Sequence, residues 1–403
     1  MLAVAAWLVV PAAAVGAPTQ IASRGTILAG GTPLFPIGLL KGPPLDGTTP
    51  WGTGALDETV AAGVTVFGTG PHGHPWTDDD LAAALAWNEA AAARGVHTWV
   101  NLRELSRAQA GTPEEAKLRR VVDALAGSPG LGFWKGADEP LLARIAPDVL
   151  RNAFAVTKGL DPRHLTILIQ APRGSLLDLA PYTSVTDVHS VDVYPVKLSR
   201  PNPNLHWVGR WTKTLWRATP SRAVLTTLQV CASGSIDRRG GTGAYVLPTR
   251  RQARYMAYDA ILHGARGLVF FGGQNPLCQG AGDRALGWNW TYWRNVLRPL
   301  VRELGPRSRL HSALVAPGTG IGVRSSDART QAASRRVGRD LWVLAARRGP
   351  GVLQVRLRGL PRTVTRAWVY REGRTVPVRD GVVTDRFAQW DVHVYRVRLP
   401  AER

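Results

Sequence analysis

The chain has 403 residues, of which 45% are hydrophobic and 20% are charged, so it can bury a large core and is not a disordered chain. Its formal net charge of +21 comes almost wholly from arginine, because only six of the 50 basic residues are lysines. No recognition motif or basic, aromatic helix accompanies this charge, which argues against a nucleic-acid partner. The length predicts one large domain followed by a smaller one.

The N-terminal segment 1–17, MLAVAAWLVVPAAAVGA, is uncharged and mostly apolar, and it ends in small residues typical of a signal-peptide cleavage site near Ala17. It lacks a basic start, so it is either a leader that begins further upstream or a short anchor, and a frayed apolar terminus is the plainer alternative. No later stretch is long and apolar enough to span a bilayer. We therefore expect a secreted or cell-envelope-associated protein.

Eight apolar, strand-like runs follow in chain order and alternate with helical patterns. Their near-continuous apolar character is typical of parallel strands that are buried on both faces. The runs span residues 34–40, 64–69, 97–102, 131–137, 165–171, 185–194, 223–230 and 267–273.

The helices between these strands have recognisable starts. Thr77 precedes three aspartates and caps an Ala-rich helix that runs to Gly95, and Thr112 with Pro113 begins the next helix. Eight such units in about 290 residues predict an α/β fold, a (β/α)8 TIM barrel over residues 18–305, rather than an open doubly wound sheet. No glycine-rich phosphate loop follows the first strand, and we expect no cofactor.

The pattern changes after residue 306. Short alternating runs such as GVLQVRLRGL and FAQWDVHVYRVRL are separated by Gly, Pro and Asp, which predicts a small antiparallel β-sandwich domain over residues 306–403. Residues 305–403 hold 20 arginines against 7 acidic residues, a net charge of +13. Solvated surface charge explains this excess, and a partner such as an anionic cell-wall polymer is the alternative.

The fourth predicted strand ends in FWKGADEP, residues 133–140. Asp138 and Glu139 therefore lie at the C-terminal end of a barrel strand, the face on which such barrels carry their chemistry. A carboxylate pair at the start of the following helix would also be favourable without any catalytic role.

The sequence resembles the glycoside hydrolases of clan A, whose fourth strand ends in a general-acid glutamate preceded by Asn or Asp and often followed by Pro. GADEP matches that ending, TPLFPIGLL the first strand, RYMAYDAILHGARGLVFF the seventh helix and eighth strand, and FAQWDVHVYRV the closing strand of the sandwich domain. The resemblance covers most of the chain. It implies that Glu139 is the general acid, with Asp138 and apolar neighbours keeping it protonated.

The seventh strand departs from that family. It reads LTTLQVCASG, and the end of this strand, where the family carries its nucleophilic glutamate, has Gln229 instead. No carboxylate follows before Asp237. On the sixth strand, SVDVYP, Asp192 and Tyr194 share one face by the period of two. We expect Asp192 to be a general base that activates water, with Tyr194 orienting it, in an inverting mechanism. A structural Asp192 paired with an arginine is the alternative, and Glu104 is a weaker candidate base.

Sugar sites combine aromatic platforms with polar side chains, and the loops after the strands supply both. The expected substrate-binding residues are His72, Trp76, Asn101, Gln170, Tyr194, Gln229 and Gln274. Trp288, Trp290 and Trp293 fit core packing better than a subsite. His72 and His74 lack a third ligand motif, so we expect no metal, and no Gly-x-Ser-x-Gly turn supports a serine hydrolase.

Cys231 and Cys278 follow strands seven and eight, on neighbouring loops of one barrel face. In an exported chain this placement predicts a disulfide, with two free thiols as the alternative. Together these features predict an exported glycoside hydrolase-like enzyme that acts on a polysaccharide or oligosaccharide. The alternative is a non-catalytic carbohydrate- or cell-wall-binding barrel that has lost the strand-seven nucleophile.

Overall fold

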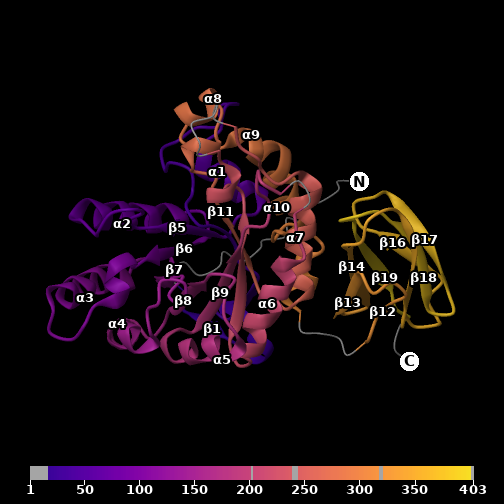
Figure 1. Ribbon diagram of the computed structural model, residues 1–403, viewed down its shortest axis with the longest axis horizontal. Coiled ribbons are helices and arrows are strands. Elements are labelled where there is room, and N and C mark those ends of the chain that lie inside the picture. The colour runs from indigo at the N-terminus through magenta and orange to yellow at the C-terminus, as the bar shows by residue number, and fades with distance from the viewer. Residues whose placement is uncertain (1–16, 201–202, 238–243, 317–320, 401–403) are drawn as a thin grey trace, which may run out of the picture.

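The computed structural model describes residues 17–200, 203–237, 244–316 and 321–400, so the expected signal segment up to residue 16 lies outside the described residues. The chain forms a closed parallel barrel of eight strands followed by an eight-stranded antiparallel sheet (Figure 1). Both confirm the predicted fold class. Among the described helices, none has the length and apolarity that crossing a membrane requires.

All eight predicted barrel strands form, and each pairs with its neighbours in parallel until the eighth closes on the first. Residues 180–185 form a 3-10 helix, so the sixth strand starts later than predicted. The strands are β4 (Ile37–Leu39), β5 (Val66–Thr69), β6 (His97–Asn101), β7 (Leu131–Asp138), β8 (Leu165–Gln170), β9 (Val188–Val193), β10 (Ala223–Gln229) and β11 (Leu268–Phe271).

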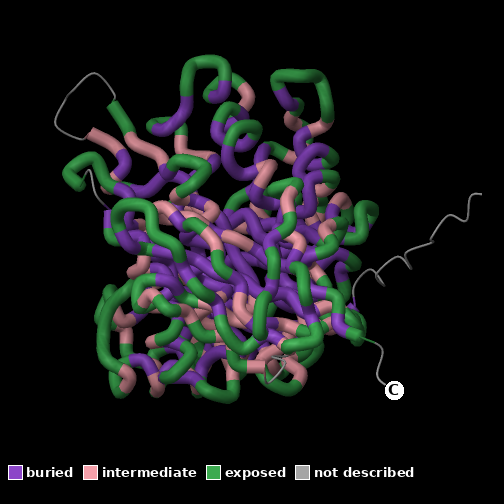
Figure 2. The backbone as a smooth tube through the Cα atoms, turned by 90° about the vertical axis from the view of Figure 1, so that its right-hand side faces the viewer, coloured by how far each residue is buried: buried purple, intermediate pink, exposed green. Residues whose placement is uncertain are grey.

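Helices surround the barrel, and the predicted caps are present. Thr77 forms a capping box with Asp80, and Thr112 accepts a hydrogen bond from the backbone N–H of Glu115. Buried backbone lies mainly in the central strands, with exposed segments around them (Figure 2). The principal helices are α1 (Ala55–Ala62), α2 (Asp78–Ala92), α3 (Pro113–Ala126), α4 (Pro147–Leu160), α5 (Leu176–Leu179), α6 (Trp207–Ala218), α7 (Arg250–Leu262), α8 (Ala281–Ala285), α9 (Trp290–Tyr292), α10 (Arg298–Leu304) and α11 (His311–Val315).

An N-terminal antiparallel sheet was not predicted. It consists of β1 (Thr19–Ile21), β2 (Ile27–Ala29) and β3 (Thr32–Leu34). Ile27 is fully buried in one apolar cluster with Leu165 and Ala223, the first residues of β8 and β10. The small sheet therefore closes the N-terminal end of the barrel. The predicted strand 34–40 joined the last residue of β3 to β4.

The C-terminal sheet has the order β12-β15-β18-β17-β16-β19-β14-β13 and encloses its own apolar core. Strand β17 pairs with both β16 and β18, so it joins two facing layers into a sandwich-like domain. The strands are β12 (Arg324–Ser325), β13 (Thr330–Val337), β14 (Asp340–Arg347), β15 (Leu353–Arg358), β16 (Arg366–Val369), β17 (Arg374–Arg379), β18 (Val382–Phe387) and β19 (Val392–Arg398).

The sandwich packs against helix α7 of the barrel (Figure 1). Trp342 and Val392 of the sandwich belong to the same apolar cluster as Met256 and Tyr258 of α7. Arg254 of α7 donates a hydrogen bond to the backbone carbonyl of Val392 at 2.6 Å. Besides the sandwich's own core, the two domains therefore share an apolar cluster at α7.

Candidate active site

The end of strand β7 is distorted where the sequence places Asp138 and Glu139. The register between β7 and β8 shifts between Lys135 and Asp138, which marks a bulge. Glu139 follows with a φ of 47°, and its backbone N–H donates to the carbonyl of Ile169 at 2.7 Å. Left-handed backbone is unfavourable for glutamate, and bulges beside active sites re-aim side chains. The local backbone thus holds Glu139 in a costly conformation, a feature that is concentrated at functional sites.

Asp192 on β9 faces the barrel interior beside Glu139. Only 7% of Asp192 is exposed, and its Oδ1 accepts no hydrogen bond from a described residue. Burial raises the pKa of Asp192 well above its usual range, and the charge of Glu139 and a side-chain hydrogen bond with it raise this pKa further. A hydrogen bond with Tyr194 acts in the opposite direction. Asp192 therefore responds to the charge of Glu139, and it keeps a proton to a higher pH than an ordinary aspartate.

Tyr194 completes this group from the residue after β9. Its ring stacks on Phe271, the last residue of β11, with 5.4 Å between ring centroids. Burial and the charge of Asp192 raise the pKa of the Tyr194 hydroxyl. The phenol therefore stays protonated and can donate to the carboxyl group of Asp192.

Gln229 ends β10 at the position where the resemblance would place a nucleophile. Its Nε2 donates to the carbonyl of Val196 at 2.6 Å and to Ser235 Oγ at 2.7 Å, and its Oε1 accepts from the N–H of Val196 at 2.9 Å. Only 1% of the residue is exposed. Its amide is thus occupied in holding the loop after β9, which argues against the substrate-binding role that we expected.

Gln170, also expected to bind substrate, supports the turn after Glu139 instead. It lies on the strand face opposite Ile167 and Ile169, which fill the barrel interior. Its Oε1 accepts a hydrogen bond from the N–H of Leu141 at 3.3 Å, while its buried Nε2 has no acceptor among the described residues. Gln170 therefore positions the Glu139 turn from behind.

Lys135 is a site residue that the sequence reasoning missed. Only 3% of it is exposed, and its Nζ lies 3.1 Å from Asp138 Oδ1 and 3.4 Å from Asn101 Oδ1. The period of two places Lys135 on the same inward face as Phe133, and this was the signal available in the sequence. The barrel mouth thus contains a buried cation that pairs with Asp138 and contacts the expected binding residue Asn101.

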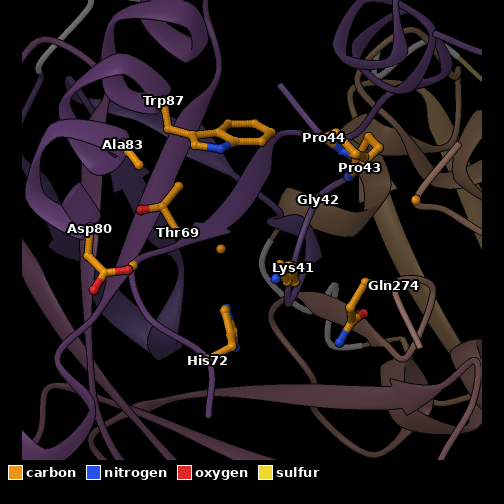
Figure 3. A pocket seen from close by; sticks show the side chains of 13 residues that line it. Lys41, Gly42, Pro43, Pro44, Thr69, His72, Asp80, Ala83, Trp87 and Gln274 are labelled. Atoms are coloured by element: carbon orange, nitrogen blue, oxygen red, sulfur yellow. The ribbon is translucent and has the colours of Figure 1, made fainter. Parts of the chain in front are cut away.

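Two adjacent hollows open beside these residues, with volumes of about 390 and 330 Å³. His72 lines both. Lys41, Trp87 and Gln274 surround the first (Figure 3), and Asn101, Glu104, Lys135, Asp138 and Phe271 are among the residues of the second. Glu139 and Asp192 line neither hollow, so Asp138 and Phe271 connect the carboxyl pair to this space.

The side chains of His72 and Gln274 both have a polar atom without a partner. His72 Nε2 and Gln274 Oε1 are buried and form no hydrogen bond with the described residues. Burial, followed by the charges of Lys41 and Lys135, lowers the pKa of His72 to about 4. His72 is therefore neutral at physiological pH, and both side chains have hydrogen-bonding capacity left for a ligand.

The tryptophans have different roles from one another. Trp76, expected to bind substrate, is 2% exposed and donates through Nε1 to the carbonyl of Asn101 at 3.1 Å, so its ring is not open to a sugar. Trp87 of α2 lines the first hollow and stacks on Phe67, and the sequence reasoning missed it. The three tryptophans expected in the core are buried there: Trp288, Trp290 and Trp293.

Glu104 lies at the second hollow with one carboxylate oxygen engaged. Its Oε1 accepts from the N–H of Trp76 at 2.8 Å, and its buried Oε2 has no partner among the described residues. Cys231 and Cys278 form the expected disulfide on the same barrel face, with a Cα to Cα distance of 6.3 Å. Within the described segments, no three His, Cys, Asp or Glu side chains gather as metal ligands would.

Solved glycoside hydrolases share this fold. One, described as a glycoside hydrolase, is 13% identical with a TM-score of 0.62 and covers 96% of this chain and 98% of its own. A family 5 glycoside hydrolase from Bacteroides vulgatus is 13% identical with a TM-score of 0.62, over 95% and 94% of the two chains. A GH27 β-L-arabinopyranosidase from Geobacillus stearothermophilus is 9% identical with a TM-score of 0.55, over 91% and 97%. The sequence matches no family model and no curated protein. At these identities the likeness shows the fold alone.

Proposed function

We propose that the protein hydrolyses glycosidic bonds at the C-terminal mouth of its barrel, with the carboxyl groups of Glu139 and Asp192 as the catalytic pair. One observation carries the proposal: Asp192, a buried aspartate with a raised pKa, senses the charge of Glu139, which follows a bulge in β7 and has a left-handed backbone conformation. A carboxyl group with a raised pKa near a second carboxyl group is an arrangement that acid and base chemistry on glycosides uses. The glycoside hydrolases that share the fold support this reading.

The pKa direction favours a reversed assignment of roles. The raised pKa favours the protonated form of Asp192, which is the form that donates a proton to the leaving oxygen, whereas a general base would have to be ionised. The influence of the Glu139 charge on the pKa of Asp192 supports carboxyl groups that lie close together, and a short separation of roughly 5–5.5 Å is typical of retaining enzymes. We therefore assign Asp192 as the acid and Glu139 as the nucleophile, in place of the inverting scheme expected from the sequence.

The proposed reaction then has two steps. Glu139 attacks the anomeric carbon while the glycosidic C–O bond breaks and the proton of Asp192 passes to the leaving oxygen. The ionised Asp192 next takes a proton from water, whose oxygen attacks the same carbon and releases Glu139. The hydroxyl of Tyr194, which interacts with Asp192, stabilises the ionised state between the steps.

The substrate class is a polysaccharide or oligosaccharide, bound in the two hollows beside His72. Trp87 offers an aromatic wall there, and Gln274 and His72 offer free polar atoms. We also propose that the protein is exported or held at the cell envelope, since disulfides persist in oxidising compartments. The Arg-rich sandwich, with its net charge of +13 over residues 305–403, would favour contact with an anionic cell-wall polymer.

Hydrolysis of a panel of defined glycans tests the function. On an active substrate with a poor leaving group, Glu139→Gln and Asp192→Asn should each lower turnover by roughly 10²–10⁴-fold. Glu114→Gln, on the exposed face of α3, is the matched control. Proton NMR of the first product should show retention of the anomeric configuration.

Inversion would restore Glu139 as the acid and Asp192 as the base. Binding without turnover across the panel would favour the non-catalytic barrel, which the missing carboxylate at Gln229 also favours.

A further inference from the structure

A further cavity, of about 400 Å³, opens at the end of the barrel opposite the two hollows. Arg222 and Arg266 lie just before strands β10 and β11, so they mark the N-terminal end, away from Glu139. Helix α6, through Trp216, and strand β13 of the sandwich, through Arg335, both contribute to the wall. The lining residues are Arg24, Trp216, Pro220, Arg222, Gly264, Ala265, Arg266 and Arg335.

The wall of this cavity carries four arginines and no acidic residue. Arg266 Nη2 donates to the carbonyl of Arg24 at 2.7 Å, and Arg335 Nη1 donates to the carbonyl of Ser334 at 3.0 Å. Neither Arg266 nor Arg335 forms an ion pair with any described residue. Arg266 and Arg335 therefore bring positive charge to the cavity that no carboxylate among the described residues pairs with.

The carboxylate nearest to Arg222 is already engaged. Asp187 Oδ1 lies 4.0 Å from Arg222, while Asp187 Oδ2 lies 3.3 Å from Lys158 and accepts from the N–H of Thr166 at 2.9 Å. Burial, then the charges of Arg335 and Arg24, lower the pKa of Arg266, which nevertheless stays charged because arginine titrates so high. The charges of Arg266 and Arg335 thus repel one another there, and a bound anion would relieve that repulsion.

Trp216 adds an aromatic surface to the same wall. It is 46% exposed, unusually open for a tryptophan, and it projects from α6. Gly264 lies against its ring, since a Cβ placed on Gly264 would be 3.5 Å from Trp216 Cγ. An open indole beside arginines suits a ligand that has both an apolar ring face and a negative group.

We propose that this cavity binds a carboxylate-bearing sugar unit of an acidic polysaccharide, with the carboxylate on Arg266 and Arg335 and the sugar ring on Trp216. Arginine binds carboxylates in a planar, bidentate manner, and the C–H face of a pyranose packs on an indole. This site is separate from the barrel mouth and does not depend on the proposed function. It would anchor the protein on an acidic glycan whether or not that glycan is the substrate.

Calorimetric titration of the full chain with trigalacturonate tests the site. The double variant Arg266→Gln/Arg335→Gln should weaken binding at least 30-fold, and Trp216→Ala should weaken it 5- to 10-fold. The matched control is Arg356→Gln/Arg358→Gln, which removes the same charge from exposed positions of β15 and should change affinity less than threefold. Arg335→Gln alone, expected to lose about tenfold, serves if the double variant does not fold.

Three results would overturn the proposal. Maltotriose, a neutral trisaccharide, binding as tightly as trigalacturonate would remove the role of the arginines. Inorganic phosphate or single-stranded DNA binding more tightly, with Trp216→Ala silent for trigalacturonate, would make this a general anion site. If the cavity variants and the β15 control lost the same affinity for trigalacturonate, the binding would depend only on net surface charge.

Discussion

The side chain of Gln229 holds the backbone of Val196 with two hydrogen bonds, one from Nε2 to the carbonyl at 2.6 Å and one from the amide N–H to Oε1 at 2.9 Å. This contact joins the end of β10 to the loop that follows Asp192 and Tyr194. The position where a nucleophile was missing from the sequence therefore has a structural use.

Gln229→Glu tests that use. The carboxylate cannot donate to the Val196 carbonyl and would be buried next to it, so the free energy of unfolding should fall by about 2–4 kcal/mol. Denaturant unfolding measures the loss, and turnover per folded molecule should not rise. A stable, more active Gln229→Glu would mean that this position accepts a nucleophile after all.

Asp192 should make stability depend on pH in an identifiable direction. Its folded pKa lies above its unfolded value, so its contribution to stability is complete below about pH 4 and is lost as the pH rises toward the folded pKa. Asp192→Asn removes this loss. The stability of the variant relative to wild type should therefore increase with pH, by up to about 1.4 kcal/mol per unit.

Asp178→Asn provides a control of opposite sign. Hydrogen bonds from Ser175 lower the pKa of Asp178, so its contribution is present at neutral pH and is lost in acid. Relative to wild type, the stability of this variant should decrease as the pH rises. Equal slopes for the two variants would contradict a raised pKa at Asp192.

Buried histidines should make the protein sensitive to acid. His189 is fully buried with both ring nitrogens unpartnered among the described residues, and burial lowers its pKa to about 3. Because the unfolded chain takes up this proton near pH 6.5, stability should fall as the pH drops from about 6.5 toward 3. His189→Leu should flatten that fall in a series of denaturant titrations, and an unchanged slope would argue against a neutral His189.

Lys135→Met should raise the pKa of His72 from its value of about 4. The Lys135 ammonium is one of the charges that disfavour the protonated imidazole, so removing it makes protonation easier. NMR titration of the imidazole resonances measures the shift. Lys158→Met, which removes a lysine paired with Asp187, should leave the pKa of His72 unchanged. No shift in Lys135→Met would place Lys135 farther from His72 than the structure does.

The disulfide should stabilise the folded protein mainly by lowering the conformational entropy of the unfolded chain. Cys231 and Cys278 are 47 residues apart, and closing a loop of this length is worth about 4 kcal/mol by chain entropy. Cys231→Ala/Cys278→Ala should lose about that amount in denaturant unfolding. A loss below about 1 kcal/mol would mean that residual structure already restricts this loop in the unfolded chain.

The barrel was predictable because its signals are local. Each strand is an apolar run, and caps such as Thr77 and Thr112 mark the helix starts. The sheet β1–β3 could not be predicted, because strands of three residues are too short to show an alternating pattern. Only Phe35 and Pro36 separate Leu34 from β4, so the end of β3 and all of β4 read as one strand.

The site was harder to predict than the fold. The period of two correctly placed Asp192 on the inward face, yet it could not show that Gln229 turns to Val196 or that Trp76 is covered. Those facts depend on where loops return in space. The bulge before Glu139 also resets the period locally, so which side chains meet there is a tertiary property.

The apolar cluster that the two domains share at α7 has a consequence for thermal unfolding. Arg254 binds both Glu303 of α10 and the backbone of Val392, and Ser308 contacts Tyr370 at 2.8 Å, so the seam is polar at its edges and apolar within. Separating the domains would open Trp342 and its neighbours to water. Heating should therefore melt barrel and sandwich in a single cooperative transition, with a calorimetric enthalpy set by the whole chain rather than by either half.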